Sequence, residues 1–266
     1  MKVALLLTGQ LRTVDMVKYV HMNTIITKYD TDVFLSINID NRFQTEYKNS
    51  RGVTATERIT ELINFFNPVD YSITNDYTPE FNSLINTIGE YIRPYRTIFE
   101  QYYVVNNAYN LLINHINKTN KKYDIIIRLR FDNFIWSGDI YFDEIHNKIN
   151  NTIQFNEFNT NMLNKLSKDK KVVFEEILDN TLYVPGFGDY CHYKYINDQL
   201  FYHDISILYK MSIFYNDLPK LFYYCITNNI ANKGAVIECI LYIFLTSNNI
   251  NYKKTNISGL FIADLN

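Results

Sequence analysis

The sequence predicts an α/β fold in which a mostly parallel central sheet is flanked by helices and followed by a helical C-terminal part. The first observation is an alternation of strand-like and helix-like segments. Strands are expected at residues 2–7, 32–37, 69–73 and 123–130, and helices between them at residues 15–29, 56–66 and 97–116. The second observation is that the strand segments are continuous apolar runs, typical of parallel strands buried on both faces. Together they predict a doubly wound sheet.

The second half of the chain contains shorter strand-like segments and several helical runs. Strands are expected at residues 139–142, 152–155 and 181–184, and helices at residues 204–215, 218–226 and 235–245. No repeat and no linker indicate a second independent domain. We therefore expect a single domain over residues 1–266.

The composition disfavours several classes of function. The formal net charge is −2 and no basic tract occurs, which argues against binding nucleic acid through its phosphates. The apolar stretch at residues 235–245 contains Glu238 and is too short to span a membrane. The three cysteines form no CxxC pair, which argues against zinc and a disulfide framework and favours a reducing compartment. We expect a soluble cytoplasmic protein.

Aromatic residues are abundant, with 23 tyrosines and 18 phenylalanines. Such rings could line a sugar-binding cleft. The abundance of Asn, Ile, Lys and Tyr also fits an AT-rich genome, and that explanation is the stronger of the two.

The most informative stretch runs from Tyr123 to Asn133. It begins as an apolar, β-branched run and then places Arg128, Arg130 and Asp132 at every second position. Side chains alternate across a strand, so these three would share one face. Burying such charges is costly unless they pair or meet a ligand. Ligands of open α/β sheets sit beyond the carboxyl ends of the strands, so we expect this strand end to face an anionic, metal-bound substrate.

The turn after the first strand is a second candidate for ligand contact. Thr8 and Gly9 end the strand, and Gly9 would let the backbone come close to a ligand. Gln10 and Arg12 offer hydrogen-bond donors, although Arg12 could instead pair with a neighbouring helix. The glycine spacing does not match a dinucleotide or P-loop fingerprint.

Several segments occur together in one order. They are the strand and Gly-Gln-Leu-Arg turn at residues 2–13, the strand at 32–37, Tyr-Asp-x-x-Ile-Arg-x-Arg-x-Asp at 123–132, Asn-Asp-Gln at 197–199 and the helix around Glu238. In this the chain resembles glycosyltransferases with the Rossmann-like A-type (GT-A) fold found in large DNA viruses and bacteria. The resemblance covers most of the chain, and it implies a location in the host cytoplasm or the virion if the protein is viral. It implies a GT-A-like fold with a nucleotide-sugar-binding half at residues 1–135 and an acceptor-binding half at residues 136–266.

The resemblance also implies an activity: hexosyl or deoxyhexosyl transfer from a UDP- or GDP-sugar to a hydroxyl of a glycan or glycoside. The residues that it implies for the nucleotide-sugar are Thr8, Gly9, Gln10, Arg12, Arg128 and Arg130, with Asp132 holding Mn²⁺ or Mg²⁺ on the diphosphate. The family norm is Asp-x-Asp, whereas the matching segment here, Arg130-Phe131-Asp132-Asn133, has one aspartate. Metal dependence therefore stays open, because Arg128 and Arg130 could neutralise the leaving diphosphate without a metal.

Asp198 is the candidate general base for the acceptor hydroxyl, while Arg130 would stabilise the leaving group. Asp198 stands at a loop-to-helix junction, where it could equally be a helix N-terminal carboxylate with Asn197 as the cap. Glu238 is the reserve candidate, although an ordinary exposed or paired charge is favoured for it. The histidines at positions 21, 146, 192 and 203 show no metal-ligand spacing and are expected to be satisfied in the core or at the surface.

Two other functions compete with glycosyl transfer. A sugar-phosphate nucleotidyltransferase would usually have a glycine-rich phosphate loop after the first strand, and residues 7–13 contain one glycine. A non-catalytic nucleotide- or carbohydrate-binding module would explain the missing second aspartate. Binding without turnover would distinguish the module from an enzyme.

Overall fold

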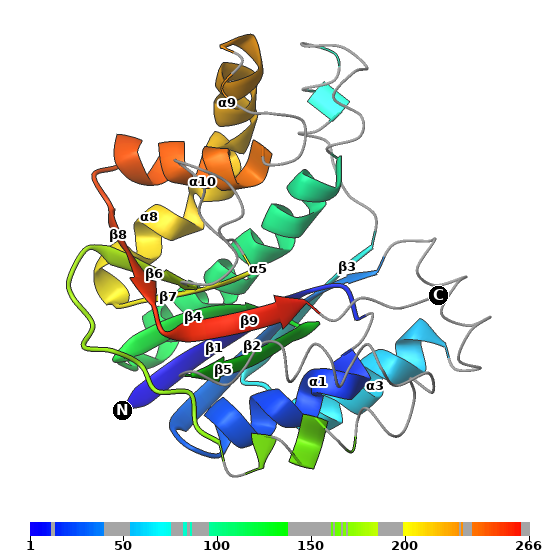
Figure 1. Cartoon of the computed structure of the whole chain (residues 1–266). Helices are drawn as coiled ribbons and strands as arrows, with labels where there is room; N and C mark the ends of the chain where they lie inside the picture. The colour runs from blue at the N-terminus through cyan, green and yellow to red at the C-terminus, as the bar shows by residue number, and fades with distance from the viewer. Residues whose placement is uncertain are drawn as a thin grey trace, which may run out of the picture.

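The fold is taken from a computed structural model of the chain (Figure 1). The structure describes residues 1–11, 14–39, 54–75, 82–83, 86, 96–137, 161, 163–165, 167–168, 170–185, 199–228, 230 and 236–261. The predicted strands at 139–142 and 152–155 lie outside these residues.

A seven-stranded sheet forms the centre of the molecule, with the order β3-β2-β1-β4-β7-β6-β8. Its strands are β1 (Lys2–Gly9), β2 (Asp30–Ile39), β3 (Asp70–Asn75), β4 (Ile125–Arg130), β6 (Thr181–Pro185), β7 (Leu200–His203) and β8 (Asn251–Thr255). Strands β3, β2, β1 and β4 run parallel to one another, and β6 runs parallel to β8. Strand β7, between β4 and β6, runs antiparallel to both. The predicted α/β fold with a mostly parallel sheet is therefore confirmed. Strands from both halves of the chain share this sheet.

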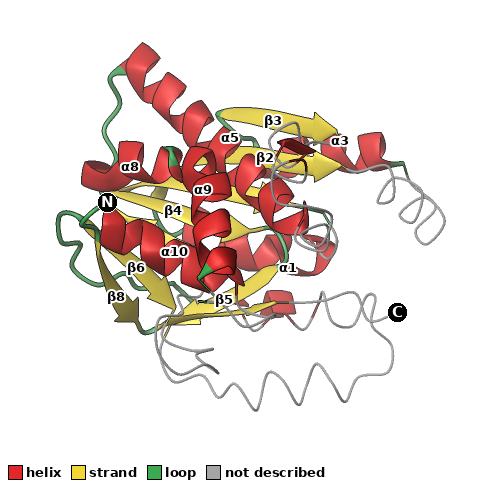
Figure 2. Ribbon diagram, turned by 90° about the horizontal axis from the view of Figure 1, so that it is seen from above, coloured by secondary structure: helices red, strands yellow, loops and turns green. Residues whose placement is uncertain are grey.

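Helices cover both faces of the sheet because the strand side chains alternate between two apolar clusters. Val3, Leu5 and Leu7 of β1 pack in the cluster that contains α1 (Val14–His21) and α3 (Ala55–Phe66). Ala4 and Leu6 pack in the opposite cluster with α5 (Arg96–Thr119). The same cluster includes residues of α8 (Leu208–Ser212), α9 (Phe214–Thr227) and α10 (Val236–Ser247). Figure 2 shows α9 and α10 lying over the strands on this side.

The C-terminal part is helical, as predicted, but it also contains strands that the sequence did not indicate. Strands β7 and β8 complete the main sheet, and β5 (Asn133–Ser137) pairs antiparallel with β9 (Ile257–Phe261). The helix expected at residues 204–215 is a 3₁₀ turn at Ile205–Ile207, then α8, then the start of α9. The helix expected at residues 15–29 is α1 followed by a π-helical turn at Met22–Ile26.

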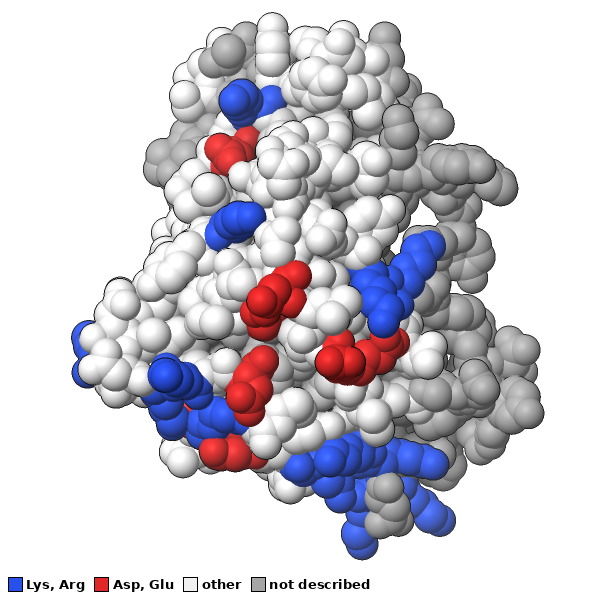
Figure 3. Space-filling model, turned by 90° about the vertical axis from the view of Figure 1, so that its left-hand side faces the viewer, with Lys and Arg blue, Asp and Glu red and all other residues white. Residues whose placement is uncertain are grey.

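Ion pairs tie the amino ends of the central strands together. The Lys2 ammonium lies 2.6 Å from Asp30 and 3.2 Å from Asp32, and Lys121 lies 2.5 Å from Asp32. The Tyr123 hydroxyl donates to Asp32 at 2.6 Å. Figure 3 shows the side of the molecule that carries the N-terminus in Figure 1, where acidic and basic side chains lie close to one another. These contacts pair the charged groups at the amino ends of the strands with one another.

No helix in the described part of the chain has both the length and the apolar character that crossing a bilayer requires.

Candidate functional site

The carboxyl ends of β1 and β4 lie side by side. These strands are parallel neighbours, with Thr8 opposite Arg130 in the register. Just beyond, the Phe131 amide donates to the Thr8 carbonyl at 3.2 Å. The two segments singled out by the sequence, the turn after the first strand and the charged end of the central strand, therefore meet at one edge of the sheet.

The turn after β1 begins at a glycine that the backbone requires. Gly9 has a φ of +114°, a conformation that L side chains rarely adopt. A Cβ built on Gly9 would have no heavy atom within 4 Å among the described residues, so space is open beside it. Gln10 follows and is half-buried. Arg12 lies outside the described residues.

Arg128 is fully buried on the α5 side of the sheet. Its Nε donates to Thr8 Oγ1 at 3.1 Å, and its guanidinium lies 5.4 Å from the ring centre of Phe201 on β7. A cation inside the core is costly, and the hydroxyl acceptor and the aromatic face contribute to offsetting that cost. Arg128 therefore places positive charge directly behind the end of β1, and no part of it is exposed to touch a ligand.

Arg130 and Asp132 form a bidentate ion pair. Nε and Nη2 of Arg130 donate to Oδ1 and Oδ2 of Asp132, each at 2.9 Å. Nη1 of Arg130 also donates to Gln101 Oε1 on α5 at 3.4 Å. The Asp132 side chain is 3% exposed and that of Arg130 is 22% exposed. Both oxygens of the predicted metal ligand are thus engaged by arginine, and Arg130 is the member of the pair that solvent reaches.

Two further residues at this turn were not predicted from the sequence. His21, at the end of α1, lies 2.9 Å from the Asn133 carbonyl through Nε2, which must be the donor because a carbonyl only accepts. Asn133 Nδ2 in turn donates to the Gln199 carbonyl at 3.2 Å. Asn133 could have been predicted, because it directly follows Asp132. Nothing in the sequence connects His21 with Asn133, a residue 112 positions away.

Two buried acceptors near Asp132 have no hydrogen-bond partner among the described residues. The Gln199 carbonyl fixes which end of the Asn133 amide is nitrogen, so Oδ1 faces the other way and has no hydrogen-bond partner among the described residues. His21 Nδ1 also has none within that part of the chain. Burial holds the pKa of His21 at about 4, against the effects of the Asn133 carbonyl and the nearby Asp132 charge. The imidazole is therefore neutral at pH 7, and Nδ1 carries a lone pair.

The oxygen atoms of Asp132 and Asn133 could supply part of the coordination of a hard cation, with the remaining ligands coming from water or a bound molecule. Asp132 and the unpartnered Oδ1 of Asn133 are oxygen ligands of the kind that Mg²⁺ and Mn²⁺ use, together with water and phosphate oxygens. Within the described residues no cluster of three or more His, Cys, Asp or Glu side chains could hold a metal by itself. Any cation here would depend on a ligand's own oxygens and would compete with Arg130 for Asp132.

The two candidate bases cannot be placed by their side chains. Asp198 lies outside the described residues, as does the side chain of Glu238, whose backbone belongs to α10. Gln199, the residue after Asp198, is described and its carbonyl meets Asn133. Of the Asn-Asp-Gln segment, Gln199 alone is described; it lies at the turn after β4, and strand β7 follows it directly.

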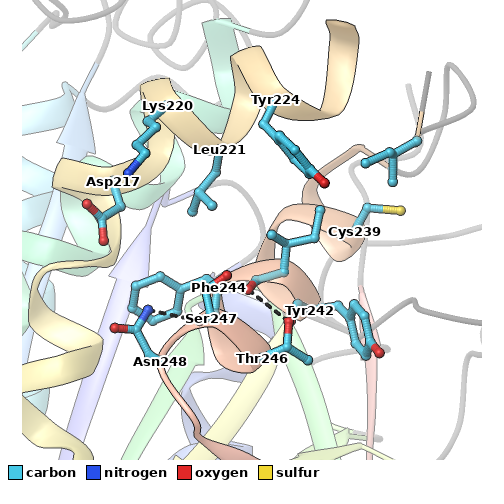
Figure 4. Close-up of a pocket in the computed structure, with 12 residues that line it drawn as sticks. Asp217, Lys220, Leu221, Tyr224, Cys239, Tyr242, Phe244, Thr246, Ser247 and Asn248 are labelled. Carbon is cyan, nitrogen blue, oxygen red and sulfur yellow. Dashed lines mark hydrogen bonds between the residues drawn. The ribbon is translucent and has the colours of Figure 1, made fainter. Parts of the chain in front are cut away.

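A cavity of about 600 Å³ lies elsewhere, between α9 and α10 (Figure 4). None of the residues that line it is among those predicted for the nucleotide-sugar, the metal or the base.

Comparison with known proteins adds little. No protein-family model and no curated protein matches the chain. Among solved structures, the chain is similar to the UDP-bound glycosyltransferase domain from the YGT toxin, with 12% identity and a TM-score of 0.37 over 94% of this chain and 68% of that one. A likeness this distant does not indicate which reaction, if any, this chain catalyses.

Proposed function

We propose that this protein is a glycosyltransferase that moves a hexosyl or deoxyhexosyl group from a UDP- or GDP-sugar to an acceptor hydroxyl of a glycan or glycoside. The observation that carries the proposal is the meeting of the β1 turn and the Arg130–Asp132 pair at the carboxyl edge of two parallel strands. Ligands of open α/β sheets bind at that edge. In this proposal residues 1–135 bind the donor and residues 136–266 bind the acceptor.

Stabilising the leaving nucleoside diphosphate falls to the arginines. Negative charge grows on the diphosphate as the sugar departs, so fixed positive charge nearby lowers the barrier. Arg130 would donate directly, since its planar fork matches phosphate oxygens and part of it is exposed. Arg128 would act at longer range from behind Thr8, without touching the donor. Gly9, Gln10 and Arg12 would contact the nucleotide through the turn that follows.

Asp132 and Asn133 are the residues that would hold Mn²⁺ or Mg²⁺. When bound, the metal would neutralise charge on the diphosphate. Both residues follow β4 directly, and Asn133 is fixed by its contacts with His21 and Gln199. Recruiting Asp132 to a metal would release Arg130 from its ion pair and free its donors for the diphosphate.

Proton removal from the acceptor is assigned to Asp198. An ionised carboxylate within hydrogen-bonding reach of the hydroxyl can accept its proton as the new bond to the sugar forms. What supports Asp198 is the contact of its neighbour Gln199 with the turn after β4. Glu238 remains the reserve.

Release of nucleoside diphosphate from UDP- and GDP-sugars, with and without Mn²⁺, tests this function. We expect one donor to be hydrolysed slowly without an acceptor and faster with a suitable glycoside. Asp132→Asn should lower that rate by about 100-fold or more, the effect expected on removing a key charged group from such a site. The matched control is Asp124→Asn, at the other end of the β4 segment, where the carboxylate is 66% exposed and accepts from the Lys2 amide. Equal activity of the Asp132 variant and the control would remove Asp132 from the mechanism.

A specific observation supports one alternative, a non-catalytic nucleotide- or carbohydrate-binding module. Both oxygens of Asp132 already accept hydrogen bonds from Arg130, so Asp132 could serve only to hold Arg130 in place and bind no metal. Arg130 would then bind the diphosphate by itself, without catalysis. If the protein binds a nucleotide-sugar but releases no nucleoside diphosphate with any divalent metal added, the non-catalytic binding module is favoured. The nucleotidyltransferase reading gains no support from the turn after β1, which has the single Gly9.

A further inference from the structure

We propose that the cavity between α9 and α10 binds a neutral saccharide. The cavity holds about 600 Å³, within the roughly 300–1,000 Å³ usual for small-molecule sites. Its lining comes from α9, α10 and the segments that follow them, and includes none of the residues assigned to the donor site. The inference goes beyond the proposed function, because the cavity would bind a saccharide whether or not the chain transfers one.

The walls combine aromatic and aliphatic surface. Leu221 and Tyr224 point from α9 toward α10 in Figure 4, and Tyr242 and Ile243 of α10 contribute to the lining. The Tyr224 side chain is 49% exposed, so much of its ring is available to a ligand. A sugar ring has apolar faces made of C–H groups, and a tyrosine ring offers a flat apolar surface with a polar tip. Covering this surface with a sugar would remove apolar area from water on both partners.

Polar groups in the same cavity are arranged as hydrogen-bond acceptors. Thr246 Oγ1 donates its proton to the Tyr242 and Ile243 carbonyls, each at 3.0 Å, so its lone pairs remain to accept. Asn248 Nδ2 donates to the Phe244 carbonyl at 2.9 Å, which leaves the amide oxygen as the acceptor on offer. Acceptors held in this way by local bonds suit the hydroxyl donors of a sugar.

The charge of the cavity disfavours an anion. Ser247 and Asn248 mark the carboxyl end of α10, where the helix dipole is negative. Asp217 adds a carboxylate, and Lys220 supplies the one ammonium group among the lining residues that the structure describes. A nucleoside diphosphate would meet more negative than positive charge here, whereas a neutral polyhydroxyl ligand would meet no such penalty. The carboxylate and the ammonium could both bond to hydroxyl groups.

Titration of the full chain with a panel of neutral sugars tests the proposal. The panel would be the methyl glycosides of glucose, galactose, mannose and N-acetylglucosamine, with cellobiose, maltose and lactose, followed by calorimetry or saturation-transfer NMR. At least one should bind with 1:1 stoichiometry and a dissociation constant of about 1 mM. Tyr224→Ala should weaken that binding about tenfold, and Asp217→Asn should weaken it severalfold.

Tyr223→Ala is the matched control. Tyr223 is the neighbouring residue on α9 and equally exposed, at 48%, but does not line the cavity, so its removal should leave the affinity unchanged. Thermal unfolding of all three variants checks that they fold. If Tyr224→Ala does not fold, the loss of affinity in Asp217→Asn tests the proposal. The absence of binding by every sugar at about ten times the expected dissociation constant would overturn the proposal. So would equal loss in the Tyr223 and Tyr224 variants, or competitive displacement of the sugar by UDP, which would place it in the donor site.

Discussion

Arg128 shows how a single residue joins the core to the site. Its charge is buried between β4, β1 and β7, with Thr8 Oγ1 and the face of Phe201 as contacts. It also opposes the rise that burial causes in the pKa of Tyr109. A buried cation is tolerated only where hydrogen bonds and nearby groups compensate for its lost hydration, and Thr8 and Phe201 supply part of that compensation.

The second buried ionisable group on this face, His203, has a purely structural arrangement. The Tyr109 hydroxyl lies 2.8 Å from His203 Nε2, and Nδ1 lies 2.6 Å from the Asp204 carbonyl. The carbonyl can only accept, so Nδ1 carries the proton and Nε2 accepts from Tyr109. Both ring nitrogens are satisfied in the neutral form. This confirms the expectation that His203 is satisfied in the core.

His203 gives the protein a predicted acid sensitivity. Burial lowers the pKa of His203 from 6.5 to about 4, although the Asp204 carbonyl and charge oppose the shift. Between these pH values the unfolded chain binds a proton that the folded chain does not, so the free energy of unfolding falls as the pH falls. The loss should approach about 1.4 kcal/mol per pH unit for each such histidine. Urea denaturation at several values between pH 7 and 5 measures it.

His203→Gln separates this contribution from the rest. His21 is buried with a similarly lowered pKa and contributes a second proton, so the wild-type slope should reflect two. The variant should be less stable at pH 7, because the Tyr109 hydrogen bond is altered, and its slope should be smaller by one proton. An identical slope in the two proteins would contradict the assignment of a neutral, buried imidazole at position 203.

At the scale of elements, α3 begins with a complete capping box. The Thr54 hydroxyl accepts from the Glu57 amide at 3.2 Å, and the Glu57 carboxylate accepts from the Thr54 amide at 2.7 Å. Thr54→Ala should lower the free energy of unfolding by about 1 kcal/mol. Thr56→Ala, an exposed position in the first turn, is the control and should cost nothing, since alanine favours helix. Equal unfolding midpoints for the two variants would show that the cap contributes no stability.

The turn at the end of β1 permits a clean test of backbone strain. Gly9 has a φ of +114°, and no described atom lies within 4 Å of where a Cβ would stand. Gly9→Ala should therefore destabilise the fold by about 1–2 kcal/mol through the backbone alone, with no clash to relieve. Chemical denaturation measures the change. An alanine variant as stable as the wild type would mean that this turn adopts another conformation in solution.

The central elements were predictable because their apolar patterns are strong. The runs that become β1, β2 and β4 are largely apolar, and the sheet buries most of their residues on both faces. The sequence did not indicate β8, because Asn251-Tyr-Lys-Lys-Thr255 is polar and four of its five residues are exposed at the sheet's edge. A strand held by backbone pairing with β6, without burial, leaves no periodic signal.

The sequence predicted only those parts of the candidate site whose residues lie on the single strand β4. Period-2 alternation placed Arg128 and Arg130 on one face, and both have contacts on that side, with Phe201 and Gln101. The bond between Arg130 and Asp132 was one of the outcomes left open, and no local rule could choose between that pair and a ligand. The contact of His21 with the residue after Asp132 depends on how α1 packs, which no pattern in the sequence encodes.

At the scale of the whole molecule, the two edges of the sheet differ in character. At the amino edge, the Asp32 carboxylate is bonded to Lys121, Tyr123 and Lys2; despite the opposing effect of burial, these contacts hold its pKa below the usual value. At the carboxyl end, Asn133 Oδ1 and His21 Nδ1 have no hydrogen-bond partner among the described residues, and the Arg130 side chain is 22% exposed. This end of the sheet therefore offers a ligand both acceptors and a donor that solvent reaches.

The most direct test of this account is calorimetric titration of the protein with UDP and GDP, with and without Mn²⁺, for the wild type, Arg130→Ala and Arg96→Ala. Arg96 is also an arginine ion-paired with a carboxylate, Glu100, but at the start of α5. The account predicts that one diphosphate binds the wild type and the Arg96 variant alike, and that Arg130→Ala weakens binding by roughly tenfold or more, as loss of a charge-assisted phosphate contact should. Failure of both nucleotides to bind the wild type, or equal affinity for all three proteins, would contradict it.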